Sequence, residues 1–255
     1  MITPVVAALA SMLVALATLA GRRWGHGVGG LLSAFPLIVG PVLFVAAERH
    51  GTAFAAHAAC ATLVGLVSVA AFAITYGRAA QRRGWRSSLL TGWAAAILLG
   101  VAAGGAEVGL AGAAAIAVVA IVAARFGLPE AVPPPRVPSP RGELAVRMLL
   151  TAALIVVISL AADQFGPVVA GVLAALPALA SVLAVFTHRS YGRQALVHLL
   201  RGMTVGLTAF AAFCAVVGGL IDHTGVAIAF TVATLTAMAI QAITIRATIE
   251  RPRIA

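Results

Sequence analysis

Apolar runs of about 18 to 25 residues recur along almost all of this 255-residue chain, and they constrain its fold more than any other feature. A helix of that length crosses a hydrocarbon core of about 30 Å. Of the residues, 62% are hydrophobic and 9% charged, which leaves too little polar surface for a soluble domain of this size. The sequence therefore predicts an all-α polytopic membrane protein surrounded by the lipid bilayer.

Nine transmembrane helices are predicted from these runs. They cover roughly residues 3–20, 27–47, 52–76, 87–104, 107–125, 144–162, 167–187, 194–219 and 225–246. The turn between the fourth and fifth spans must be tight around Glu107. The one long connection, FGLPEAVPPPRVPSPRGE, contains prolines that forbid a helix and favour an extended linker.

The arginines predict the orientation of the chain in the membrane. All 17 basic residues are Arg, and nearly all of them lie between the apolar runs, so the net charge of +10 indicates topology rather than binding to nucleic acid. With the N-terminus outside and the C-terminus in the cytoplasm, Arg49 alone lies outside and Arg201 lies within a span. The inner side then receives Arg22, Arg23, Arg78, Arg82, Arg83, Arg86, Arg125, Arg136, Arg141, Arg147, Arg189, Arg193, Arg246, Arg251 and Arg253.

Comparison of the chain with itself at a shift of 141 residues indicates an internal repeat. The matched pairs in this register are Gly25–Gly166, Gly30–Gly171, Leu32–Leu173, Pro36–Pro177, Gly51–Gly192, His57–His198, Gly65–Gly206, Phe72–Phe213 and Gly77–Gly218. Matches at Pro, His, Phe and several Gly in one register are hard to obtain by chance, even in a chain rich in Ala and Leu.

The repeat predicts the domain organisation. The first four-helix repeat covers residues 1–105, a linker helix 106–128, a Pro-rich cytoplasmic loop 129–143, and the second four-helix repeat 144–255. Because one extra crossing separates the two units, the second is inverted relative to the first. Inverted repeats of this kind are common among secondary transporters, whose sites lie where the halves meet.

Two matched segments, GGLLSAFPLIVGP and AGVLAALPALASV, are the candidate substrate-binding helices. Pro36 and Pro177 each remove a backbone donor and are expected to kink their spans near mid-depth. A broken helix offers free backbone groups to a substrate, but Gly and Pro also serve close packing in membranes. The further candidates in these segments are Gly40, Pro41, Ser33 and Ser181; each serine either contacts substrate or bonds a freed carbonyl.

Arg201 and the two histidines are the other candidate binding residues. Arg201 lies about two turns inside its span, either as a counter-charge for an anionic head group or as a side chain that reaches the inner interface. His198 shares its helix face, and His57 is the matched residue in the other half. The histidines suit a proton relay, or they are interfacial residues satisfied by water or a carbonyl.

Motifs for other classes of protein are missing from the sequence. It contains no H-E-x-x-H, Walker A or G-x-S-x-G motif and no pair of carboxylates in mid-span, so we expect no enzyme activity, cofactor or metal. Cys60 and Cys214 fall in apolar runs, where buried thiols are expected. GxxxG patterns at 25–29, 100–104 and 202–206 predict close helix contacts, within a protomer or between protomers of a homodimer.

The segments WGHGVGGLLSAFPLIVGPVLF and FGPVVAGVLAALPALASVLAVF resemble bacterial inner-membrane proteins that are built on an "aG-x-L-a-x-x-P" helix. Small relatives of the GlpM type are single four-span units, so the resemblance implies a duplicated unit in a bacterial inner membrane. It carries no settled activity and no functional residue. The chain is thus expected to be an alternating-access transporter for an apolar or amphipathic substrate, anionic or lipid-like. The alternative is a membrane subunit or scaffold for a partner enzyme.

Overall fold

The computed structural model describes residues 2–105, 108–132, 142–174 and 177–249, the last part of the third stretch by its backbone alone. These residues form helices and no strand. In chain order the helices are α1 (Ile2–Trp24), α2 (His26–Ser33), α3 (Val39–His50), α4 (Thr52–Ala79), α5 (Trp85–Gly104), α6 (Leu110–Gly127), α7 (Glu143–Ala174), α8 (Ala178–Thr224) and α9 (Val226–Ile249).

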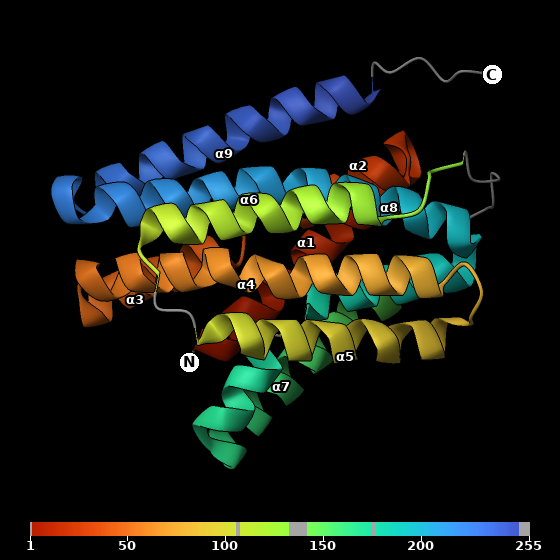
Figure 1. Ribbon diagram of the computed structural model, residues 1–255, viewed down its shortest axis with the longest axis horizontal. Coiled ribbons are helices and arrows are strands. Elements are labelled where there is room, and N and C mark those ends of the chain that lie inside the picture. Colours follow the sequence, from red (N-terminus) through yellow and green to blue (C-terminus); the bar gives the residue numbers. More distant parts are fainter. Residues whose placement is uncertain (1, 106–107, 133–141, 175–176, 250–255) are drawn as a thin grey trace.

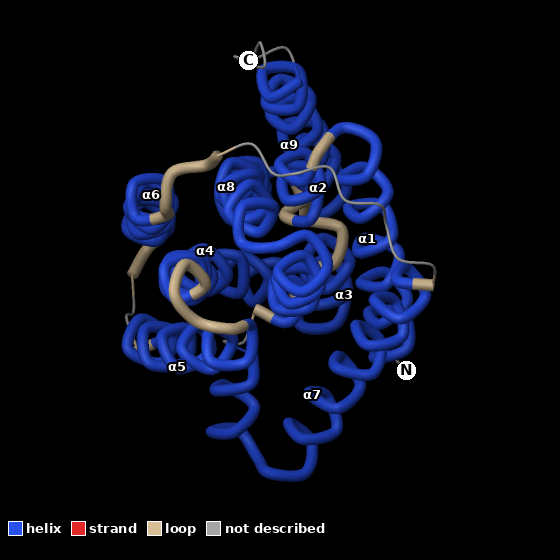
Figure 2. Tube along the Cα trace, turned by 90° about the vertical axis from the view of Figure 1, so that its right-hand side faces the viewer, coloured by secondary structure: helices blue, strands red, loops and turns tan. Residues whose placement is uncertain are grey.

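Helices α4 and α8 form the centre of the bundle (Figures 1 and 2). They contact each other; α3, α5 and α6 pack on α4, while α2, α6 and α9 pack on α8. Helix α7 packs on α1 and then leads away from the bundle (Figure 2). Large side chains such as Phe72 and Tyr76 of α4 and Leu200 of α8 are fully buried between the central helices.

The peripheral helices α6 and α9 pack on the central helices through alanine side chains. The buried face of α6 consists of Ala113, Ala117, Ala120 and Ala124, and that of α9 begins with Ala229, Ala233 and Ala237. The spacing of three and four residues places each set on one helix face. Small side chains let the helix backbones approach closely, which is how helices associate in lipid, where no hydrophobic force drives them together.

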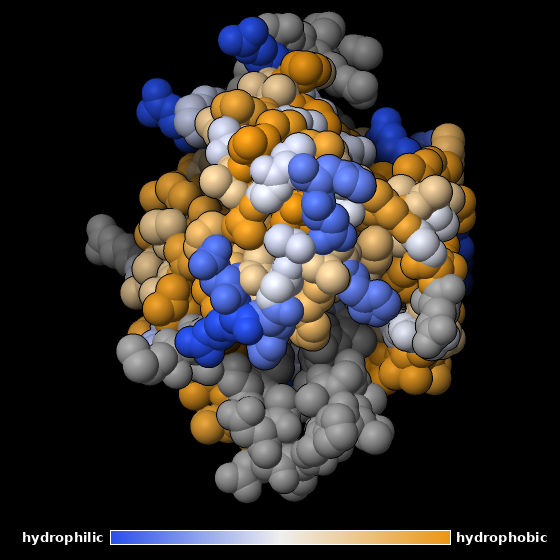
Figure 3. Space-filling view, turned by 90° about the vertical axis from the view of Figure 1, so that its left-hand side faces the viewer, coloured by the Kyte–Doolittle hydropathy of each residue, from blue (hydrophilic) through white to orange (hydrophobic). Residues whose placement is uncertain are grey.

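The outer surface is apolar, as a membrane protein requires. Leu98, Val119 and Leu149 are about 70% exposed, and Phe126 is 82% exposed. Figure 3 looks onto the left-hand end of Figure 1 and shows blue side chains in the middle of that face, with mostly orange ones along its sides. Six helices in the described residues are long and apolar enough to cross a membrane. The protein is therefore an all-helical membrane protein.

The observed helices differ from the predicted spans where the chain bends. The predicted span 27–47 is divided into α2 and α3, each too short to cross alone. The predicted spans 167–187 and 194–219 meet in α8, which is 47 residues long and has a non-helical residue, Gly192, inside it. The turn expected at Glu107 lies outside the described residues, as do residues 133–141 of the Pro-rich loop and Arg136, Arg141, Arg251 and Arg253.

Several helix boundaries recur 141 residues apart. Residues that begin α1, α4 and α5 match Glu143, Arg193 and Val226, which begin α7, the second part of α8, and α9. Gly51 has φ 88° and ψ 167°, and its match Gly192 has φ 79° and ψ 178°. That backbone conformation is almost restricted to glycine. The chain thus bends at these two matched glycines for the same local reason.

Candidate functional site

An apolar hollow lies where the chain leaves α2 and enters α3. We call it the Phe-lined hollow; it has a volume of about 410 Å³ and is lined by Leu9, Phe35, Pro36, Leu37, Gly40, Pro41, Phe44, Phe213, Phe230 and Thr234. Three of the predicted binding residues are therefore part of it. The ring of Phe230 meets those of Phe44 and Phe213 edge-on, with centroids 5.4 and 6.0 Å apart. Phe44 is 42% exposed and Phe213 only 3%, so the hollow opens on the surface and has a buried floor.

Pro36 creates this hollow by interrupting the helix, as predicted. The amide N–H of Ala34 donates to the carbonyl of Leu31 at 3.3 Å, so the helical bond to Gly30 is lost. Ser33 satisfies that carbonyl: its hydroxyl donates to Gly30 O at 2.6 Å. Helical bonding resumes when Gly40 N–H donates to Pro36 O at 3.0 Å. The role predicted for Ser33 on the freed carbonyl is confirmed.

At the matched break, Pro177, a tryptophan of α5 reaches the start of α8. Pro177 is buried immediately before α8, and the Ser181 hydroxyl donates to its carbonyl at 2.9 Å. Ser181 in turn accepts a hydrogen bond of 2.8 Å from the indole nitrogen of Trp93 on α5. Pro177 and Ser181 do not line the Phe-lined hollow. The structure thus does not bring the two proline segments together at one site.

Arg201 and His198 hold the connection after α6. Arg201 donates to the carbonyls of Pro129 at 2.8 Å and Leu128 at 3.2 Å, and a ring nitrogen of His198 lies 3.0 Å from Val132 O. Arg201 precedes Phe213 by twelve residues on α8, about 18 Å along the helix. His57 is exposed on α4 and does not line the hollow. Binding roles for these three residues stay predictions.

A backbone contact between α2 and α8 closes the bundle at the right-hand end of Figure 1. A Cβ atom on Gly202 would lie 1.8 Å from Gly27 O, and one on Gly206 would lie 2.3 Å from Leu31 O. The close contact predicted for the 202–206 pattern is therefore confirmed. In the 25–29 pattern, a Cβ atom on Gly29 would lie 2.6 Å from Ala17 O of α1, so a close helix contact forms there too. One on Gly25, or on Gly104 of the third pattern, would meet none of the described residues within 4 Å.

Gln241, which the sequence analysis did not single out, reinforces this contact from α9. Its side chain is 4% exposed, and its Nε2 donates to Leu31 O at 2.8 Å. Its Oε1 has no hydrogen-bond partner. One amide thus ties α9 to the end of α2, next to the place where Gly206 lies against the same carbonyl.

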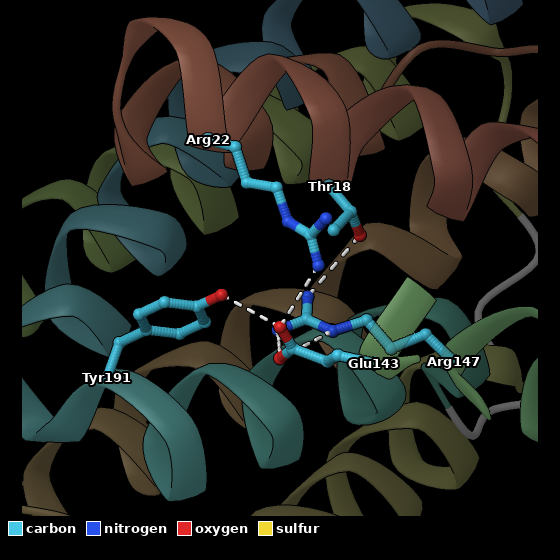
Figure 4. A network of polar contacts seen from close by, with 5 residues as sticks. All are labelled: Thr18, Arg22, Glu143, Arg147 and Tyr191. Atoms are coloured by element: carbon cyan, nitrogen blue, oxygen red, sulfur yellow. Dashed lines mark hydrogen bonds and ion pairs between the residues drawn. The ribbon is translucent and has the colours of Figure 1, made fainter. Parts of the chain in front are cut away.

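A buried charge network joins α1, α7 and α8 (Figure 4). Arg147 Nη2 donates to Glu143 Oε1 at 2.6 Å, and these residues are 3% and 5% exposed. The other carboxylate oxygen accepts from Tyr191 at 2.7 Å and from Arg22 at 3.3 Å. Arg147 also donates to the Thr18 hydroxyl at 3.4 Å. Two guanidinium groups and a phenol keep the carboxylate in its ionised form.

This network fixes three helices relative to one another and leaves little room for a ligand. The cavity beside it measures about 10 Å³, the space of about one water molecule. The sequence signal for this network is the pair Glu143 and Arg147, which are four residues apart at the start of an apolar span. The partner residues Thr18 and Tyr191 are far away in the chain and only the fold brings them close.

Groups of potential metal ligands do not form in the part of the chain that is described. No three His, Cys, Asp or Glu side chains lie together there as a metal site needs. A second apolar groove, also of about 410 Å³, lies between α4, α5 and α6 and is lined entirely by Ala, Val, Leu and Ile. We call it the aliphatic groove. The Phe-lined hollow differs from it by its aromatic walls and its threonine.

Comparison with models of protein families found no match to this chain. Comparisons with curated proteins and with solved structures found none either. The function therefore has to be argued from the hollow, the breaks and the charges described above.

Proposed function

We propose that this protein is a small alternating-access transporter for an apolar or amphipathic substrate, with the Phe-lined hollow as its binding site. The observation that carries the proposal is the hollow itself: an interrupted helix, a floor of buried Phe213 and a rim of exposed Phe44. Interrupted helices at an open cavity are how transporters of this size build a site inside a bilayer. Aromatic rings offer large apolar surface to a lipid-like molecule.

The proposed architecture is nine crossings in two inverted four-helix repeats, joined by α6. The recurrence of helix starts and of the glycine bend at a distance of 141 residues supports it. The arginines at the ends of α1, α4, α6 and α9 support an orientation with the N-terminus outside a bacterial inner membrane and the C-terminus in the cytoplasm. In this orientation the α2–α8 contact lies in the inner half of the membrane and the hollow in the outer half.

An unequal closure of the two halves supports alternating access. A Cβ atom on Gly206 would lie 2.3 Å from the backbone of α2, whereas at its match, Gly65, a Cβ atom would meet none of the described residues within 4 Å. Among the described residues, one glycine of this matched pair is thus in backbone contact with a neighbouring helix and the other is not. We infer that the two halves exchange these arrangements, so that the α2–α8 contact opens when the matched contact near Gly65 forms.

The alternative function, a membrane scaffold for a partner enzyme, is favoured by a different observation. The α2–α8 interface is packed to backbone contact, and a hydrogen bond from Gln241 adds to it. A permanent contact of this kind suits a rigid subunit that supports a partner. The two readings differ in one respect that is measurable without a substrate: whether the α2–α8 contact opens.

Topology is the first prediction to test. Single cysteines at Arg23 and at its match, position 164, are expected to be labelled from opposite sides of the membrane by an impermeant reagent. Cytoplasmic and periplasmic reporters on the termini should place the N-terminus outside and the C-terminus inside. Labelling of both positions from one side would mean parallel halves and would remove the main support for a transporter.

Opening of the α2–α8 contact is the second prediction. Val28 of α2 is 2% exposed. In a background without Cys60 and Cys214, Val28→Cys is expected to react with an impermeant thiol reagent from the inner side, as the contact opens transiently. Leu63→Cys is the control, because Leu63 is 0% exposed in the α4–α8 core and should stay unreactive.

The prolines provide a second arm of that experiment. The double variant Pro36→Ala, Pro177→Ala restores two helical donors and is expected to slow the labelling of Val28→Cys about tenfold or more, while the protein stays folded. If Val28→Cys is as unreactive as Leu63→Cys in the parent background, the contact is permanent and the scaffold reading replaces the transporter.

A further inference from the structure

The two halves fill one pair of matched positions differently. In the 141-residue register Gly40 matches Ser181, and Thr234 matches Trp93. Trp93 spans the space between α5 and α8 and is hydrogen-bonded to Ser181 at 2.8 Å. Gly40 and Thr234, by contrast, both line the Phe-lined hollow. The hollow therefore lies beside two small residues, Gly40 and Thr234. At the matched positions of the other half, the residues are instead Ser181 and the large Trp93, joined by a hydrogen bond.

The polar character of the hollow is equally specific. Its lining contains no ionisable side chain, and Thr234 is the one residue with a polar side-chain group. Thr231, one turn before it, donates its hydroxyl to Ala227 O at 2.7 Å. The Thr234 hydroxyl has no such bond among the described residues, and Thr234 is exposed where it lines the hollow. It is free to bond a ligand.

Charged groups near the hollow do not favour an ion of either sign. Arg201 and His198 contact backbone carbonyls at the far part of α8. Beyond Phe44, the end of α3 exposes Glu48 and Arg49, whose charges oppose each other. A charged head group inside the hollow would lose its hydration without meeting a counter-charge, which is costly at that depth in a bilayer.

We propose that the Phe-lined hollow takes an uncharged amphiphile with an alcohol-like head, and that Gly40 and Thr234 determine this specificity. The apolar part of the ligand packs on the rings of Phe44, Phe213 and Phe230, and its head bonds the Thr234 hydroxyl. Gly40 leaves the floor open beside Phe213, whose ring would lie 3.4 Å from a Cβ atom there. This inference rests on the proposed function, because it assumes that the hollow is the substrate site.

Photolabelling in lipid nanodiscs tests the proposal. Two probes with the same diazirine-bearing dodecyl chain are compared, one an alcohol and one a sulfonate, and the labelled residues are mapped by mass spectrometry. Labelling of the aliphatic groove serves as the reference for the amount of each probe in the bilayer. Relative to that reference, the alcohol is expected to label α3 and α9 residues of the hollow at least about tenfold more than the sulfonate.

Variants assign the effect to the two residues. Thr234→Val keeps the shape and removes the hydroxyl, and is expected to reduce alcohol labelling about two- to tenfold. Gly40→Ser with Thr234→Trp copies the filled half and should abolish labelling by both probes. The double variant Trp93→Thr, Ser181→Gly is the control, because it makes the reverse changes at the matched positions outside the hollow. It should leave labelling of the hollow unchanged. Thermal unfolding of each variant checks that it remains folded.

The outcomes separate the two proposals. Equal or stronger labelling by the sulfonate would overturn the uncharged ligand but leave the hollow as a binding site. Unchanged alcohol labelling in Thr234→Val would overturn the role of its hydroxyl. If neither probe labels the hollow above the aliphatic groove, the proposed substrate site fails together with this inference.

Discussion

Replacement of Glu143 by Leu is expected to lower the free energy of unfolding by about 3–5 kcal/mol. The change leaves the Arg147 guanidinium, whose side chain is 3% exposed, without the carboxylate that now accepts two of its hydrogen bonds. Arg22, held 3.3 Å from that carboxylate, would then face Arg147 with no negative charge between them. Thermal and denaturant unfolding in detergent, followed by circular dichroism, would measure the loss.

A double variant distinguishes a buried charge from lost packing. Glu143→Leu combined with Arg147→Met removes both charges, and is expected to be more stable than Glu143→Leu alone, since apolar residues often replace a buried pair at little cost. Glu48→Leu, at an exposed position on α3, is the surface control and should change stability by less than about 0.5 kcal/mol. A single variant no worse than this control would contradict a structural role for the network.

Gly206→Ala is expected to cost about 1–3 kcal/mol of stability, because the added methyl group has no room. It would lie 2.3 Å from the Leu31 carbonyl and 2.9 Å from the Cβ of Ala34. The backbone of α2 would have to move, and the hydrogen bond from Gln241 to the same carbonyl would be disturbed. A lower unfolding temperature and weaker protection of α2 in hydrogen exchange are the measurable results.

The matched glycine is a control built into the chain. A Cβ atom on Gly65 would meet none of the described residues within 4 Å, so Gly65→Ala is expected to be neutral or slightly stabilising, as alanine favours a helix more than glycine does. The two variants make the same chemical change at equivalent positions. Equal changes in stability for the two variants would show that the α2–α8 contact tolerates an added methyl group. They would contradict the proposed difference in closure between the two halves.

Local features of the sequence predicted much of the fold. The apolar runs indicated helices in a membrane, and the prolines indicated where two of them break. Both expectations depend on covalent geometry and on the lack of water in lipid, so neighbours along the chain suffice. The glycine bends at 51 and 192 also follow from local backbone freedom. The number of crossings and the inverted relation of the halves stay predictions.

The candidate site could be predicted only in part. Pro36, Gly40 and Pro41 line the hollow because they belong to the break, but Phe213, Phe230 and Thr234 reach it from helices about 170 to 200 residues away. Arg201 illustrates the opposite case. Its position inside a span suggested a counter-charge for a substrate, and its side chain instead donates to two carbonyls of the connection after α6. The sequence shows which hydrogen-bond donors are present, but which acceptors lie near them depends on how the helices pack.

The sequence by itself determined that this protein is helical, lies in a membrane and bends at particular glycines and prolines, because those properties arise from solvation and from the conformational limits of single residues. The tertiary structure decided which pairs of small residues meet and which leave space. Gly206 and Gly65 are the same residue in matched positions, yet a Cβ atom on Gly206 would meet the α2 backbone and one on Gly65 would meet none of the described residues within 4 Å. That difference depends on how whole helices are placed, which no local pattern encodes.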